Sequence, residues 1–117
     1  KLLNGINSTA ENLKAAAAGE HEEWTSMYPE FAKVAREEGF TRIANLFEMV
    51  AKIEQEHDAR YNLLLANIQE DKVFKRNEKM IWMCSNCGHV YEGTEAPEIC
   101  PVCAHPKAFF EIKANNY

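Results

Sequence analysis

The cysteines of this 117-residue chain have the spacing of a metal site. They form two Cys-x-x-Cys pairs separated by twelve residues, Cys84 with Cys87 and Cys100 with Cys103. Two thiolates three positions apart on a tight turn can chelate one ion, and two such turns complete a tetrahedron of four sulfurs. Disulfides are the alternative, but the rest of the chain has no cysteine and its first residues do not resemble a signal peptide. The pattern therefore predicts a four-cysteine metal site.

The spacing does not choose between iron and zinc, because both metals accept four thiolates in a tetrahedron. Gly88 follows the second cysteine and permits a backbone that turns amide groups toward the sulfurs. We expect four aromatic side chains to wrap the site, Trp82, Tyr91, Phe109 and Phe110. Such wrapping suits redox tuning of iron and equally suits the small core of a structural zinc ribbon. The residues alone leave both metals open.

Carboxylates and an imidazole form a second candidate site in the first half of the chain. Glu20 and Glu23 are three positions apart, and so are Glu54 and His57, which puts each pair on one face of a helix. If these helices fold antiparallel about Gly39, residues at equal height have numbers that sum to roughly 78. Glu20 then meets His57 or the residue after it, and Glu23 meets Glu54 or the residue after it. We therefore expect all four side chains at one level of the hairpin.

Metal ions would offset the cost of burying such charges between two helices. The spacing matches the carboxylate-bridged di-iron pattern, in which two helices of a four-helix bundle each supply a Glu and the other two each supply Glu-x-x-His. One hairpin holds half of that set, so a second hairpin must supply the rest. The alternative for Glu54 and His57 is a solvated polar face, since the sequence around them is polar throughout.

The other polar residues near this level are interpreted as surface or packing groups. We expect solvent-facing charges at Glu22, Glu56 and Asp58, and an exposed, non-liganding His21. Tyr28 lies two helical turns after the first candidate ligand. It is expected either to hydrogen-bond a ligand carboxylate or simply to pack.

These side chains need two helices and a short turn to position them. Ser8 and Glu11 have the form of a capping box, so a first helix should begin near residue 9 or 10 and continue to Gly39. Pro29 lies inside this run and predicts a bend near residues 27–28 in an otherwise continuous helix.

A second helix is expected from Thr41 to about residues 67–71, because apolar residues recur there at spacings of three and four. The polar run that follows is typical of a linker, and residues 80–83 and 89–91 have the pattern of short strands beside the first cysteine turn. The sequence thus predicts an α+β fold in which a helical hairpin precedes a small four-cysteine metal domain. The expected boundaries are 1–8 for a lead-in, 9–71 for the hairpin, 72–79 for the linker and 80–117 for the metal domain.

The charge is unevenly distributed along the chain. Residues 1–71 carry 13 acidic and 7 basic side chains, whereas residues 72–117 carry 5 acidic and 6 basic ones. This balance lacks the basic stripe of a nucleic-acid surface, so we expect no nucleic-acid partner. No apolar run is long enough to cross a bilayer, so we expect no membrane association. Reduced thiolates favour a reducing compartment, most simply the cytoplasm.

Three motifs together resemble the rubrerythrin family from residue 9 to the end of the chain. Residues 10–23, followed by Met-Tyr-Pro at 27–29, resemble its third bundle helix, and Glu-Gln-Glu-His at 54–57 resembles its fourth. The two Cys-x-x-Cys pairs, with Gly88, Tyr91 and the ending Ala-His-Pro at 104–106, resemble its C-terminal rubredoxin-like domain with a shortened loop.

The resemblance implies that the hairpin is half of a ferritin-like bundle. Its di-iron centre would be held by Glu20, Glu23, Glu54 and His57, with Glu54 as the bridge between the ions and Tyr28 beside them. The resemblance also favours iron at the four cysteines, as a single ion that relays one electron at a time. Family members reduce hydrogen peroxide to water in anaerobic or microaerophilic cells.

Rubrerythrins normally place another helix pair before this region, outside the present sequence. We therefore expect a homodimer of hairpins, or a separate N-terminal helix-pair segment, to complete the site. The expected function is a hydrogen peroxide reductase, with electrons supplied by a donor such as a rubredoxin or an NAD(P)H-dependent reductase. The alternatives are a rubredoxin-like electron-transfer module without di-iron chemistry and a structural zinc ribbon on a helical adaptor.

Overall fold

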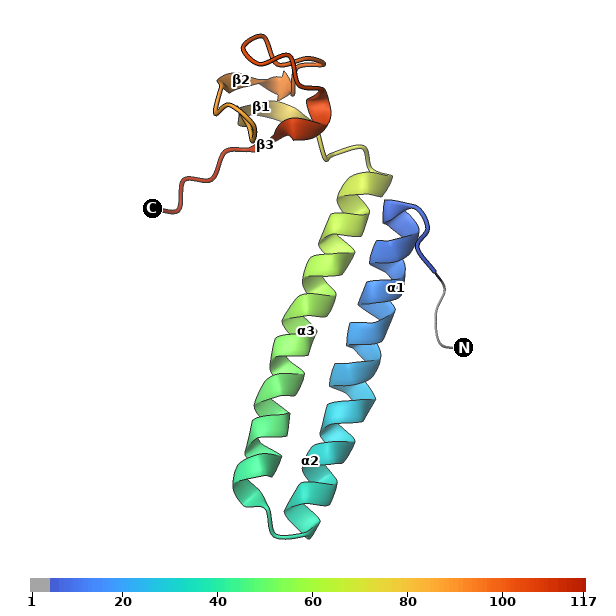
Figure 1. Cartoon of the computed structure of the whole chain (residues 1–117). Coiled ribbons are helices and arrows are strands. Elements are labelled where there is room, and N and C mark those ends of the chain that lie inside the picture. The colour runs from blue at the N-terminus through green and yellow to red at the C-terminus, as the bar shows by residue number, and fades with distance from the viewer. Residues whose placement is uncertain (1–4) are drawn as a thin grey trace. The chain divides into compact units, whose positions relative to one another are not determined.

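A computed structural model describes residues 5–117, so residues 1–4 of the expected lead-in lie outside the described part. The chain forms two compact units, with the boundary between Ala66 and Asn67. The first unit is a helical hairpin, and the second is a small sheet that carries the four cysteines (Figure 1). This arrangement confirms the α+β fold class.

The first arm of the hairpin is an interrupted helix. It consists of α1 (Thr9–Glu22), a π turn (Glu23–Met27) and α2 (Tyr28–Glu37). Ser8 caps α1, since its hydroxyl accepts the backbone N–H of Glu11 at 3.2 Å. The predicted start of the helix is confirmed.

The π turn lies where Pro29 disturbs the hydrogen bonding of the helix. Proline has no N–H to offer to the carbonyl four residues earlier, so a regular ladder cannot pass through it. The N–H of Tyr28 instead reaches back five residues to the carbonyl of Glu23. The hydroxyl of Thr25 donates to the carbonyl of His21 at 2.5 Å. The predicted irregularity before Pro29 is therefore present, and it takes the form of a wide turn that holds one extra residue.

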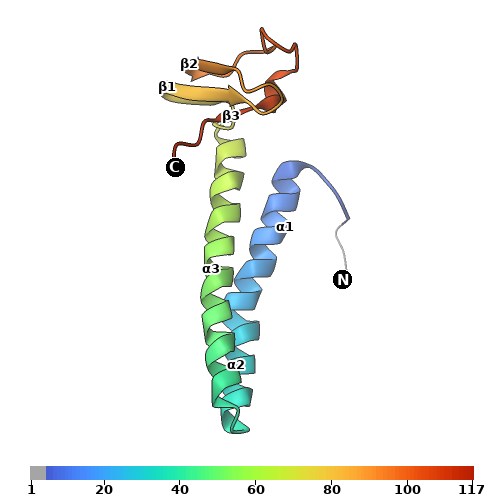
Figure 2. The same cartoon turned by 60° about the vertical axis from the view of Figure 1, so that its left-hand side comes forward.

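The turn of the hairpin ends the first arm and begins α3 (Thr41–Gln69). Gly39 has a φ of 87°, the left-handed conformation that glycine adopts without steric cost. Around it, the N–H of Phe40 bonds the carbonyl of Ala35 at 2.8 Å and the N–H of Gly39 bonds the carbonyl of Arg36 at 3.1 Å. This is a Schellman motif, and it sends α3 back along the first arm in antiparallel direction (Figures 1 and 2).

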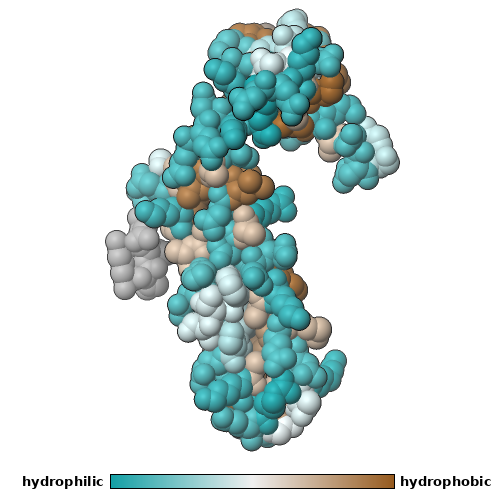
Figure 3. Space-filling model, turned by 180° about the vertical axis from the view of Figure 1, so that it is seen from behind, coloured by the Kyte–Doolittle hydropathy of each residue, from teal (hydrophilic) through white to brown (hydrophobic). Residues whose placement is uncertain are grey.

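Small side chains line the seam between the two arms. The buried apolar residues there are Ala17, Ala32, Ala35 and Ala44. Larger apolar side chains of the hairpin stay exposed, among them Phe31, Val34, Leu46, Met49 and Ile53. Figure 3 shows hydrophobic surface along the hairpin between hydrophilic side chains. An uncovered apolar surface of this kind is typical of one half of a helical bundle.

The second unit contains a three-stranded antiparallel sheet. Its strands are β1 (Lys75–Cys84), β2 (Val90–Glu95) and β3 (Phe110–Ile112), in the order β2-β1-β3. The two predicted strands lie within or beside β1 and β2. The third strand follows the second cysteine turn and was outside the sequence prediction, because three residues give no readable alternation.

The structure differs from the expected linker at residues 72–79. Lys75 already pairs with Glu95, and strand β1 continues from there with an irregular register up to Met80. Just before it, Phe74 packs against the core of the second unit, and its carbonyl accepts the N–H of Ala96 at 2.9 Å. Backbone pairing and one apolar anchor therefore make this polar run part of the second unit, which begins at Asn67.

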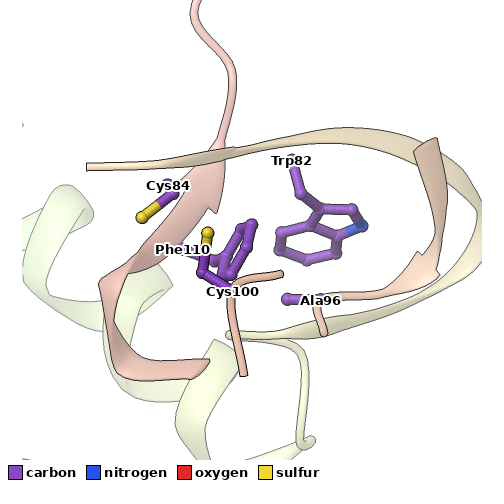
Figure 4. Close-up of a cluster of buried hydrophobic side chains, with 5 residues drawn as sticks. All are labelled: Trp82, Cys84, Ala96, Cys100 and Phe110. Atoms are coloured by element: carbon purple, nitrogen blue, oxygen red, sulfur yellow. The ribbon is translucent and has the colours of Figure 1, made fainter. Parts of the chain in front are cut away.

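The core of the second unit is small and includes two of the cysteines (Figure 4). Its buried members are Trp82, Cys84, Ala96, Cys100 and Phe110. The indole N–H of Trp82 donates to the carbonyl of Gly93 at 2.9 Å, which satisfies its one polar atom. The core therefore forms around the cysteine turns.

Two of the four aromatic residues expected to wrap the cysteines do not do so. Tyr91 is 41% exposed and Phe109 is 37% exposed. The ring of Tyr91 lies over Gly93, where a Cβ would meet it at 2.7 Å, and the ring of Phe109 packs edge-on against His105 at 4.6 Å between centroids. Both rings cover neighbouring backbone or side chains at the surface, so the enclosed core is smaller than predicted.

Candidate metal centres

The four cysteine sulfurs converge on one point in the second unit. The Sγ atoms of Cys84, Cys87, Cys100 and Cys103 all lie within 4.8 Å of one another. The Sγ atoms of Cys84 and Cys103 lie 3.6 Å apart, and so do those of Cys87 and Cys100. A metal–sulfur bond of about 2.3 Å places the sulfurs of a tetrahedron about 3.8 Å apart, whereas a disulfide needs about 2.05 Å. The sulfur geometry therefore fits a metal ion and not disulfides.

Two similar backbone turns present these sulfurs. The N–H of Gly88 bonds the carbonyl of Cys84 at 2.9 Å, and the N–H of Ala104 bonds the carbonyl of Cys100 at 2.9 Å. Gly88 has a φ of 87°, as the sequence predicts for a permissive position, and Ala104 has a φ of 63° at the matching place in the second turn. Alanine in this left-handed region carries a steric penalty that glycine does not.

We expect opposite effects on stability from exchanging the two residue types. Ala104→Gly relieves the strained φ and should raise the unfolding free energy of the metal-loaded protein by about 0.5–1 kcal/mol. Gly88→Ala should lower it by about 1–2 kcal/mol through backbone strain, since nothing lies within 4 Å of the added Cβ. Urea denaturation of both variants at equal metal content checks this, and a loss of stability in Ala104→Gly would contradict it.

Backbone amides also point at the sulfurs. The N–H of His89 donates to the Sγ of Cys87 at 3.4 Å. The backbone N–H of His105 is the main cause that lowers the pKa of Cys103 to about 5. At Cys87 the N–H of His89 lowers the pKa, but burial and the neighbouring thiols outweigh it and raise this pKa to about 12. Four thiolates cannot coexist here without a cation, so the site is built to exchange protons for a metal.

A second cluster lies between the arms of the hairpin. Glu20, Glu54 and His57 each offer one ligand atom within 4.8 Å of the others. The Nδ1 of His57 lies 2.9 Å from Glu54 Oε2 and 3.6 Å from Glu20 Oε1. Both carboxylate side chains are only 16% exposed. The structure therefore brings three of the four predicted ligands together, with the carboxylates largely removed from solvent.

The electrostatics of this cluster suit a bound cation. Glu20 Oε2 is buried and has no hydrogen-bond partner among the described residues. A hydrogen bond to Glu54, followed by burial and the charges of Glu54 and Glu23, raises the pKa of Glu20 to about 7. The hydrogen bond from Glu20 lowers the pKa of Glu54, so a proton bound by the pair resides on Glu20. A metal ion would replace that proton and supply the orphaned oxygen with a partner, so these residues fit one.

The other two predicted site residues lie outside the cluster. Glu23 opens the π turn, is partly buried, and acts on Glu20 through its charge and a hydrogen bond. The ring of Tyr28 packs against Phe31 and Phe47, with centroids 5.9 Å and 6.0 Å away. These ring contacts agree with the packing alternative for Tyr28.

Models of known protein families match both units of the chain. The family model for rubrerythrin matches residues 4–65, more than half of the chain, and the model for the rubrerythrin rubredoxin-like domain matches residues 82–111. The chain belongs to the rubrerythrin family. The predicted resemblance is confirmed, and the four cysteines in a rubredoxin-like domain support iron binding.

Individual relatives agree with this assignment. The chain is 55% identical to a rubrerythrin of Porphyromonas gingivalis, over 96% of this chain and 56% of that protein. It is 52% identical to rubrerythrin-1 of Clostridium acetobutylicum, over 96% of this chain and 57% of that protein. A solved structure of fully reduced, all-ferrous nigerythrin has a TM-score of 0.54 and 29% identity, covering 97% of this chain and 53% of that one. The chain thus spans about half the length of the rubrerythrins it matches.

One further residue of this rubrerythrin hairpin contradicts the sequence prediction. Asp58 is buried, with 8% exposure, although the sequence predicts a solvent-facing charge. Its carboxylate accepts the indole N–H of Trp24 at 2.7 Å and the amide of Asn62 at 2.6 Å, and lies 3.2 Å from Nδ1 of His21. The bond from Trp24, ahead of those from His21 and Asn62, holds the pKa of Asp58 below its usual value.

The polar residues around Asp58 in the sequence give no indication that it is buried. Glu22 and Glu56 are exposed as predicted, and the side chain of His21 is 62% exposed. Asp58 turns instead toward the seam, where His21 lies at nearly equal height on the other arm. The same antiparallel pairing that matches the ligands would have identified this contact.

Within residues 5–117, none of the helices of this rubrerythrin-family chain combines the length and apolar character that a membrane crossing needs.

Proposed function

We propose that the chain supplies half of a di-iron site that reduces hydrogen peroxide to water, with iron at the four cysteines as the electron relay. The observation that carries this proposal is the convergence of Glu20, Glu54 and His57 around a buried carboxylate oxygen that has no hydrogen-bond partner among the described residues. Family membership agrees with an oxidoreductase of this kind.

Each predicted ligand would have a role in metal binding that follows from its chemistry. Glu20 and Glu54 would bind the irons through hard, charged oxygens, and His57 would add a neutral nitrogen. Glu23 would add a carboxylate from the π turn, with Tyr28 beside it. Bound iron would supply the electrons that cleave the oxygen–oxygen bond. Each peroxide takes up two electrons and two protons and yields two waters.

The cysteine site is suited to electron relay and not to peroxide binding. Four sulfurs fill the tetrahedron and leave no open position for peroxide. Cys87 is exposed while Cys84 and Cys100 are buried, so the site has one edge at the surface. Electrons from a rubredoxin or an NAD(P)H-dependent reductase would enter and leave through this edge, in a reducing compartment such as the cytoplasm.

A second hairpin would complete the carboxylate site. The exposed apolar surface of the present hairpin is the surface that such a partner would cover. The partner would be another copy of this chain or a separate N-terminal helix pair, which would add its own Glu and Glu-x-x-His.

Metal analysis combined with a peroxide assay tests the proposal. The purified protein with its second hairpin should be red, bind one iron at the cysteines of each chain and two more in each completed bundle, and consume peroxide when a reductant is supplied. One iron per chain and no peroxide consumption would instead favour the electron-transfer module. A colourless protein with zinc at the cysteines would favour a structural ribbon and contradict the relay.

A further inference from the structure

Asp58 lies beside the predicted metal ligands without being one of them. It bonds across the seam to His21 and Trp24 and along its own helix to Asn62. We call these four residues the Asp58 clasp. Asp58, His21 and Trp24 each directly follow a predicted ligand in the sequence.

Because each clasp residue across the seam is adjacent to a predicted ligand on the same helix, the clasp and the ligands must move together. Consecutive helical residues differ by about 1.5 Å in height and about 100° in direction. The clasp and the ligand cluster therefore lie at one level of the hairpin, on neighbouring faces. Trp24 also belongs to the π turn that Glu23 opens. A shift of one arm at the clasp must move the ligands of that arm by a similar amount.

The rest of the seam has no polar contact at this level apart from the ligands among the described residues. It is lined by buried alanines, and the ring of Phe47 in α3 packs against Tyr28 and Phe31 nearer the turn. Arg36 bonds Asn45 and Glu48 across the hairpin, but close to the turn. The contact between Glu20 and His57 involves the ligands themselves, so a bound metal would replace it. The clasp consists of directional hydrogen bonds at the same height as the ligands, and metal binding would leave these bonds intact.

We propose that Asp58 is a positioning residue of the hairpin metal site. Its bonds to Trp24 and His21 hold the first arm at the height where Glu20 faces Glu54 and His57. This inference rests on the proposed function, because it assigns to Asp58 the pre-arrangement of that same site. The residue touches neither metal nor substrate and acts through the ligands beside it.

Cobalt titration of clasp variants tests the inference. The protein used is the full chain with its second hairpin and with iron already bound at the cysteines. Trp24→Phe removes the indole N–H and leaves a smaller aromatic ring, and Asp58→Asn removes the charge. Each should raise the Kd for Co²⁺ at the hairpin about 10- to 100-fold. Arg36→Met cuts the other polar contact across the hairpin and serves as the matched control, with an expected change below about twofold.

Two results would overturn the inference, and both are separable from a failure of the proposed function. Unchanged cobalt affinity in Trp24→Phe, or a loss equal to that of Arg36→Met at matched Tm, would remove the role of the clasp. If the unmodified protein binds no Co²⁺, the proposed function fails, and the clasp is judged on the metal-free protein. There the imidazole ¹⁵N signals of His57 should shift in Trp24→Phe and stay unchanged in Arg36→Met. If the ¹⁵N signals of His57 are the same in Trp24→Phe as in Arg36→Met, the role of the clasp is rejected. If Asp58→Asn does not fold, Trp24→Phe alone decides the test.

Discussion

Removal of the metal from the four cysteines is expected to unfold residues 67–117 while the hairpin stays folded. Two of the five buried core residues of this unit are the cysteines Cys84 and Cys100. A unit of this size has a marginal core of its own, and the free energy of binding a structural metal is then largely the free energy of folding, on the order of 10 kcal/mol. The substitution Cys100→Ser should have the same effect as a chelator.

The two tryptophans report on the two units separately. The indole N–H of Trp82 bonds the carbonyl of Gly93 in the second unit, and that of Trp24 bonds Asp58 in the hairpin. After chelation, the NMR signal of Trp82 should move to its unfolded position while that of Trp24 persists. Val102→Ala, at an exposed position between two ligands, is the control and should keep both signals. A Trp82 signal that survives complete metal removal would show that the core folds without the metal.

Glu54→Gln is expected to abolish metal binding at the hairpin and to lower peroxide turnover at least about 100-fold. The amide keeps the size of the side chain but removes the charge and one strong acceptor oxygen. The visible absorption of the cysteine iron should not change, because that iron lies in a separate unit with its own ligands. The iron content per chain and the rate of peroxide consumption measure the two effects.

Glu56→Gln is the matched control for this substitution. Glu56 lies two positions away on the same helix, is exposed, and loses the same charge. Iron content and turnover should remain within about twofold of the unmodified protein. Equal losses in Glu54→Gln and Glu56→Gln would mean that overall charge, and not a ligand, explains the effect.

Local signals account for most of what the sequence predicts correctly. The Ser8 cap, the turn at Gly39 and the disturbance before Pro29 each depend on a few adjacent residues. The short turn then fixes the antiparallel pairing, which is why Glu20 and His57 could be matched across the hairpin. The Cys-x-x-Cys spacing likewise carries the geometry of its own turn.

Residues whose environment depends on distant segments were not predicted. Asp58 lies in a polar stretch, and only the crossing of the two arms places it beside Trp24. The polar run 75–79 becomes strand because Phe74 anchors it and Glu95 pairs with its first residue. Tyr91 is an aromatic residue that was expected to face the core, but its ring lies over Gly93 at the surface. The residue type gives the chemistry of a side chain, whereas its burial and pairing depend on the segments that it contacts.

The extra residue of the π turn sets the rotational phase of α2. One additional residue turns every later side chain by about 100° relative to an uninterrupted helix, and the ring contact between Phe31 and Phe47 depends on that phase. An alignment of this arm with a regular helix must therefore open a one-residue gap between Glu23 and Met27. Without the gap, core positions of one chain are compared with solvent positions of the other. The gap is thus a marker by which related chains that share this bulge can be recognised from sequence.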